Sequence, residues 1–252
     1  MKNPEGLLKI LDEYELDIFT IQLFESVTHE LFKVWHQQFR TLIKNGLIDI
    51  IEKGKYCRHN FRNEYIIGNY LVDDGIISYW SALNLHGLTE QISNTVFVQT
   101  QKPKRNVIVF GVRYQFIKVK PQKVAGIEIE GYGNHTYRIT DQEKTIIDCF
   151  DLPEYGGEFP GIIRAFAGNN WDEQKLIDYA IKVNNAAVIK RVGFCAELFA
   201  LPVNRFINFS KEHVTRTISL FDNTGKDSGP IVTSWGLRLN VSREDILAMK
   251  HY

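Results

Sequence analysis

The stretch KNGLIDIIEKGKYCR, residues 44–58, decides how the first part of this chain is expected to fold. Gly46 follows a long helical pattern and is placed to end that helix as its C′ residue. LIDII then alternates as a strand does, Lys53–Gly54 is a turn dipeptide, and KYCR supplies a returning strand. The stretch therefore predicts a helix that leads directly into a small β-hairpin carrying several basic side chains.

Three helices are predicted upstream of that hairpin. The first covers about Glu5 to Tyr14, and the second begins at Thr20, a suitable N-cap residue, and runs to Val27. The third, HELFKVWHQQFRTLIKNG at residues 29–46, is expected to use Thr28 as its cap. One apolar stripe follows its helical period: Leu31, Phe32, Trp35, Phe39, Leu42 and Ile43. Three helices followed by a two-stranded hairpin are the element order of a winged helix-turn-helix.

The polar side of the third helix and the hairpin suggest DNA as the partner. A helix that presents Lys, Arg, Gln or His fits the major groove, where such groups reach base edges. A basic hairpin beside it suits phosphates, which add affinity without reading sequence. The predicted DNA-binding residues are His29, Lys33, His36, Gln37, Arg40, Lys53, Lys55 and Arg58. The alternative is that this polar face is only solvated, since winged helices also serve as protein-interaction modules.

Charge is sorted along the chain although the totals balance at 30 basic and 30 acidic residues. Balanced totals argue against a generally polyanion-binding protein, whereas local patches indicate specific partners. Residues 1–27 are acidic and residues 28–62 are basic. Residues 99–123 carry seven basic side chains and no acidic one, and residues 124–162 are again acidic.

The length of the chain suits two domains, and the order of the predicted helices and strands predicts an α+β protein. The chain of 252 residues is comfortable for two, and we place the boundary near Phe61, giving domains 1–60 and 61–252. No apolar run of transmembrane length and no signal peptide is apparent, so we expect a cytoplasmic protein without a membrane partner. Cys57, Cys149 and Cys195 are isolated, which suggests reduced thiols and no metal site.

The second domain is predicted to mix strands and helices. Residues 60–70 are interpreted as a polar connection, and alternation in residues 107–120 favours half-buried antiparallel strands. The basic residues of this region are candidates for a second electropositive surface: Lys102, Lys104, Arg105, Arg113, Lys118, Lys120 and Lys123. Contact with nucleic acid and an ordinary solvated sheet face remain alternative interpretations of these residues.

No catalytic signature is found, so the chain is not predicted to be an enzyme and no cofactor is expected. Asp141, Glu143 and Asp148 are the most tempting acidic group. However, Thr140 and Glu143 match a capping box, and Asp148 lies about 140° around the helix from Glu143. The glycine-rich stretch GYGNH at residues 131–135 lacks the lysine and helix context of a phosphate loop.

Several motifs resemble the AbiEi family of type IV toxin–antitoxin antitoxins. They are the hairpin GKY, DDGIISYWSALNLHGLTEQ at residues 73–91, RITDQEKTIIDCFDLPEYGG at residues 138–157, and the pair SLFD and SWGLRLNV near the C-terminus. The resemblance covers most of the chain. It implies an N-terminal winged helix that represses its own operon by binding inverted repeats in promoter DNA. It also implies a C-terminal mixed α/β antitoxin domain that counters a nucleotidyltransferase-like toxin in abortive infection, a form of phage defence.

Two other functions stay open from the sequence. One is a stand-alone winged-helix transcriptional regulator whose C-terminal domain senses a ligand or mediates dimerisation. The other is an enzyme that uses the winged helix to hold a nucleic-acid substrate, which requires acidic or His/Cys residues to converge in the folded second domain.

Overall fold

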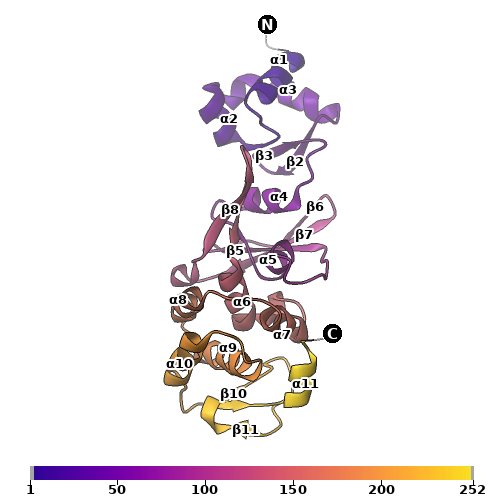
Figure 1. The fold of residues 1–252 in the computed structure, drawn as a ribbon. Helices are drawn as coiled ribbons and strands as arrows, with labels where there is room; N and C mark the ends of the chain where they lie inside the picture. The colour runs from indigo at the N-terminus through magenta and orange to yellow at the C-terminus, as the bar shows by residue number, and fades with distance from the viewer. Residues whose placement is uncertain (1–2, 251–252) are drawn as a thin grey trace.

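The computed structural model describes residues 3–250 and forms an elongated molecule of three units stacked along one axis (Figure 1). Helices and a small sheet at the N-terminus stand on a six-stranded sheet, and helices at the C-terminus cover its other side. The buried apolar side chains form three clusters, and two of them cross unit boundaries. Ile18, Ile51 and Cys57 of the N-terminal unit pack with the sheet, and Tyr79, Phe97 and Ile117 of the middle unit pack with the C-terminal helices. The α+β class predicted from the sequence is confirmed, with eleven α-helices among the described residues.

The N-terminal unit contains three helices and three short strands. In chain order these are α1 (Pro4–Glu13), β1 (Ile18–Thr20), α2 (Ile21–Thr28), α3 (Phe32–Lys44), β2 (Ile48–Glu52) and β3 (Lys55–Arg58). β3 lies between β1 and β2 and pairs with both in antiparallel fashion. Phe39 of α3 is at the centre of the unit's core, with ring centroids 4.5 Å from Phe32 and 5.3 Å from Phe24. The two predicted turn signals are present, because Gly46 and Gly54 have φ angles of 67° and 81°.

The third helix begins three residues later than the sequence suggested. Thr28 does not cap it, because the Thr28 hydroxyl donates to Phe24 O and accepts from the backbone N–H of Glu30. His29 takes a left-handed φ of 56° and ends α2. The first N–H of α3 is instead satisfied by α2, since Glu25 Oε1 accepts from Phe32 N at 2.8 Å. The Glu25 carboxylate of the preceding helix therefore takes the place of a local N-cap side chain.

Removing that carboxylate should cost a typical capping energy. We expect Glu25→Ala to lower the free energy of unfolding by about 1 kcal/mol, because Phe32 N would lose its acceptor at the start of α3. Gln22→Ala, an exposed position on the same helix, is the control and should change stability by less than about 0.5 kcal/mol. Urea denaturation of both variants measures the difference. Equal stability of the two would remove Glu25 from this role.

The middle unit is a sheet covered by helices on both faces. Before it comes α4 (Glu64–Leu71), a helix in the segment interpreted as a polar connection; Asn63 caps it by accepting from Tyr65 N and Ile66 N. The sheet order is β6-β7-β5-β4-β9-β8. Its elements are β4 (Ile76–Ile77), α5 (Tyr79–Leu85), β5 (Thr95–Thr100), β6 (Val107–Val109), β7 (Val112–Lys118), β8 (Ile127–Tyr132) and β9 (His135–Thr140). The predicted antiparallel pairing holds for β6 and β7, but β5 and β7 run parallel.

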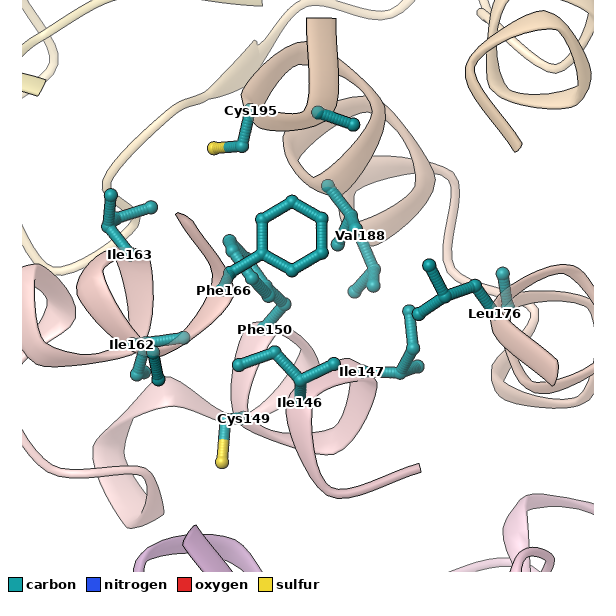
Figure 2. Close-up of a cluster of buried hydrophobic side chains, with 14 of the residues drawn as sticks. Ile146, Ile147, Cys149, Phe150, Ile162, Ile163, Phe166, Leu176, Val188 and Cys195 are labelled. Carbon is teal, nitrogen blue, oxygen red and sulfur yellow. The ribbon is translucent and has the colours of Figure 1, made fainter. Parts of the chain in front are cut away.

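The C-terminal unit is mainly helical. It comprises α6 (Gln142–Asp151), α7 (Phe159–Ala167), α8 (Glu173–Val183), α9 (Ala186–Leu198), α10 (Asn204–Glu212), the short strands β10 (Ser219–Leu220), β11 (Ile231–Val232) and β12 (Leu237–Arg238), and α11 (Arg243–Ala248). Figure 2 shows its core, where Phe150 and Phe166 meet side chains from α6, α7 and α9. No helix within residues 3–250 combines the length and the apolar composition that crossing a membrane would need.

Polar contacts also join the N-terminal unit to the sheet. The β8–β9 hairpin reaches up to it, where Asn134 Nδ2 donates to Tyr14 O at 3.1 Å and His135 Nε2 lies 3.0 Å from Asp17. On another side, Lys104 Nζ binds the Glu52 carboxylate at 2.8 Å. These contacts link the first unit to the sheet both through the hairpin tip and through β2.

Candidate nucleic-acid interface

One face of α3 is a continuous polar surface. Its side chains are at helical spacing and all are exposed: Lys33, His36, Gln37, Arg40 and Lys44. The opposite face buries Phe32, Trp35, Phe39 and Leu42, which fixes the rotation of the helix. Because the apolar stripe is buried in the core, packing fixes the rotation of α3, and the basic face must point toward solvent.

The α3 basic face has no partner within the described part of the chain. None of its five side chains forms a hydrogen bond or an ion pair with another residue of 3–250. The nearby acids are used elsewhere: Glu25 caps α3 through Phe32 N, and Glu30 accepts from Trp35 Nε1 at 3.0 Å. An unneutralised row of Lys, Arg, His and Gln is the surface that phosphates and base edges recognise.

His29, the first predicted DNA-binding residue, does not belong to this row. It is exposed, but it lies in the turn between α2 and α3 with the left-handed φ already described. Because His29 lies outside α3, its side chain does not follow the helical arrangement of the Lys33 and His36 side chains. It stays near the interface as a turn residue rather than as a helical base reader.

The β2–β3 hairpin holds its three basic residues in three different ways. Lys53, in the turn, is exposed. Lys55 is partly buried, and its Nζ donates to Leu71 O at 2.8 Å and lies 3.5 Å from Glu52. Arg58 makes an ion pair of 3.1 Å with Asp12 of α1. Lys55 and Arg58 thus bind partners within the chain, and Lys53 is the hairpin cation that faces solvent.

The second predicted basic surface does not form one patch. Arg113 and Lys118 lie at opposite ends and on opposite faces of β7, which puts them about 17 Å apart. Lys104 is bound by Glu52, and Lys123 by Asp151. Lys102, Arg105 and Lys120 are exposed in the connections around β6 and after β7. One subset lies together: a groove of about 460 Å³ is lined by Lys118, Lys120 and Lys123, and Asn184 and Asn185 also line it.

The acidic residues of α6 are held by internal partners. Asp141, not Thr140, is the N-cap, accepting from Lys144 N at 2.8 Å, and it also accepts from Tyr179 Oη. Glu143 accepts from Asp172 N rather than closing the predicted capping box. The predicted capping box is therefore wrong. Asp141 accepts the hydrogen bond from Lys144 N at the start of α6, and Glu143 binds the N-terminus of α8 through Asp172 N. Within residues 3–250 no group of His, Cys, Asp and Glu has the arrangement of a metal site.

Asp148 forms a buried polar network with the sheet. Its carboxylate pairs with Lys144 one turn earlier and accepts from Gln99 Nε2 of β5 at 2.6 Å. Lys144 is fully buried and Asp148 is 2% exposed. Burial raises the pKa of the Asp148 carboxyl, and the Lys144 ammonium opposes that shift. The spacing of four residues between Lys144 and Asp148 is evident in the sequence, whereas the burial of both charges is shown only by the structure.

Comparison with known proteins gives a likeness of fold alone. No protein-family model and no curated protein matches the chain. Among solved structures, the crystal structure of the RV2827C protein from Mycobacterium tuberculosis superimposes with a TM-score of 0.65 at 10% identity, covering 92% of this chain and 89% of that one. The chain is therefore similar in fold, over nearly its whole length, to the RV2827C protein.

Proposed function

We propose that this chain is a DNA-binding transcriptional regulator whose N-terminal unit acts as a winged helix-turn-helix. The observation that carries the proposal is the α3 basic face, which is exposed, held by an aromatic core behind it and unpaired within the described residues. In this account α3 enters the major groove, and Lys33, His36, Gln37 and Arg40 contact bases or phosphates there. The β2–β3 hairpin is the wing, and Lys53 at its turn contacts a flanking phosphate.

The resemblance to AbiEi antitoxins suggests which gene is regulated. We propose that the operator is an inverted repeat upstream of the chain's own gene, and that the C-terminal units oppose a nucleotidyltransferase-like toxin encoded next to it. A reporter gene fused to that upstream region tests the first part. Expression of the chain should lower reporter output, and a chain with both Lys33 and Arg40 replaced should not. Failure of the intact chain to repress, with DNA binding retained in vitro, would place the operator elsewhere.

The antitoxin part has its own test. Co-expression with the adjacent gene should restore growth of cells that the adjacent gene product inhibits. If the chain represses its promoter but gives no rescue, the stand-alone regulator with a ligand-sensing or dimerising C-terminal part becomes the preferred function. If it gives rescue when the toxin is driven from a foreign promoter, the C-terminal units act on toxicity itself and not only on expression.

Two lysines of the hairpin should behave differently when removed. Lys53→Ala should weaken binding to every DNA alike and reduce the slope of log K against log salt by about one unit, because one phosphate contact is lost. Lys55→Ala should leave that slope unchanged and lower stability instead, since Lys55 Nζ is bonded to Leu71 O. Salt titrations of binding and urea denaturation of both variants measure this. A slope change for Lys55 equal to that for Lys53 would contradict the assignment of the hairpin cations.

A further inference from the structure

β8 is an exposed edge strand that pairs with no strand on its outer side within residues 3–250. It ends the six-stranded sheet, and all six of its residues are exposed, including Ile127 (43%), Ile129 (72%) and Tyr132 (79%). The opposite edge, β6, has only three residues. Proteins usually shorten, cover or bend long edge strands that carry apolar side chains, because an open edge pairs with other chains. β8 is therefore unusual for a surface that stays unoccupied.

The pairing with β9 shows which backbone groups of β8 are free. A two-residue loop, Gly133–Asn134, joins Tyr132 to His135, and the residues flanking such a loop form a hydrogen-bonded pair. Gly126 O accepts from Asp141 N at 2.7 Å, which gives the same alternation at the other end. Even-numbered residues thus bond to β9. Ile127 and Ile129 direct their N–H and C=O groups outward.

The edge is held in place before any partner arrives. The hairpin tip is fixed to the N-terminal unit by Asn134 and His135, as described above, and Figure 1 shows the hairpin rising along the side of the sheet. Gly131, with φ of 99°, interrupts the regular strand, so the usable edge is Ile127–Glu130. Because β8 is already ordered, binding of a partner strand does not have to include the entropy cost of ordering β8.

The charge of β8 indicates what kind of strand it accepts. Glu128 and Glu130 are exposed on one face and form no ion pair with another residue of 3–250, while Ile127 and Ile129 lie on the other face. Antiparallel pairing of β8 with β8 of a second copy, with like faces aligned over these residues, sets glutamate opposite glutamate. Like charges directly opposite each other destabilise a sheet. A basic strand places its cations against Glu128 and Glu130 instead.

We propose that β8 receives an additional strand from a partner protein, in a segment that alternates β-branched apolar residues with lysine or arginine. The outward N–H and C=O groups of Ile127 and Ile129 supply the hydrogen bonds, and the alternation of Ile and Glu supplies specificity. This site is on a different unit from the α3 basic face and goes beyond DNA binding.

The test uses a short capped peptide that alternates lysine with valine, titrated into the full chain labelled with ¹⁵N. The expected result is a set of NMR shift changes confined to β8 and its neighbours, weakened by salt. Ile129→Pro removes an outward N–H and leaves the hydrogen bonds to β9 intact. It should lower the affinity for the peptide about tenfold. Ile129→Thr keeps the N–H and serves as the control, with a loss of about threefold or less.

Charge is tested by a second pair of variants. Glu128→Lys/Glu130→Lys should abolish the shift changes, whereas Glu90→Lys/Glu154→Lys makes the same change of net charge at exposed positions elsewhere and should retain them. Shift changes spread over other acidic surfaces, equal losses for the proline and threonine variants, or absence of any change with the wild type would each overturn the proposal. DNA binding by Ile129→Pro should stay at the wild-type level, so this result is independent of the proposed regulator function.

Discussion

Lys144→Met is expected to lower the free energy of unfolding by about 3–5 kcal/mol, because it leaves the Asp148 carboxylate buried without its counter-charge. Methionine fills much of the space of the lysine stem, so the loss comes mainly from the charge. Gln99 Nε2 remains as a hydrogen-bond donor to Asp148 and does not neutralise it. Urea denaturation at pH 7, followed by circular dichroism, measures the change.

Two controls separate the charge from the packing. Lys144→Met/Asp148→Leu removes both charges and should recover most of the loss, since apolar replacements of buried pairs are often neutral or stabilising. Lys175→Met breaks an ion pair with Asp141 whose lysine side chain is 43% exposed, and it should cost only about 1 kcal/mol or less. A double variant as unstable as the single one would show that Lys144 matters through its packing.

The pH dependence of the Lys144→Met variant follows from the sign of the Asp148 shift. Burial raises the pKa of this carboxyl in the folded state, and removing Lys144 takes away the group that opposes the increase. A raised folded pKa gives stability that is present below the unfolded pKa of about 4 and is lost as pH rises. The deficit of the variant relative to wild type should therefore shrink as the pH is lowered from 7 toward 4.

Reversing two charges on the α3 basic face should nearly eliminate DNA binding. Lys33→Glu/Arg40→Glu replaces two cations by anions on a surface that we propose to lie against phosphates, and an affinity loss of about 100-fold or more is expected at moderate salt. Both side chains are exposed, so the fold should be retained. Fluorescence anisotropy with the upstream duplex measures the loss.

The control for this variant has the same charge change in another unit. Lys182→Glu/Arg216→Glu alters one exposed lysine and one exposed arginine of the C-terminal unit and should leave DNA affinity within about threefold of wild type. Equal losses for the two double variants would mean that net charge, not the α3 basic face, controls binding.

The sequence was informative where structure is determined locally. Gly46 and Gly54 adopt positive φ as their turn roles require, and Thr20 caps α2 by accepting from Leu23 N. The apolar stripe of the third helix likewise identified the buried face, although Leu31, predicted as part of it, is 52% exposed and precedes the helix. Each of these features depends on a few neighbouring residues, so propensity and periodicity are sufficient.

The misinterpretations share a non-local cause. The start of α3 is set by Glu25, seven residues before Phe32, and Lys55 is bound to Leu71 O, sixteen residues later. Neither partner can be identified from helix or strand periodicity. Periodicity does not indicate the helix α4, because its apolar residues are interspersed with polar and aromatic ones, although Asn63 is a usable cap signal. Tertiary contacts therefore decide which predicted basic residues remain available to a partner.

The most direct measurement of the central claim is fluorescence-anisotropy binding of the full chain to its own upstream region and to a scrambled duplex, at two salt concentrations. We predict tighter binding to the native sequence, with affinity for both duplexes falling as salt rises because phosphate contacts release counterions. Equal and weak binding to both duplexes would contradict the account and make the α3 basic face a surface for a different partner.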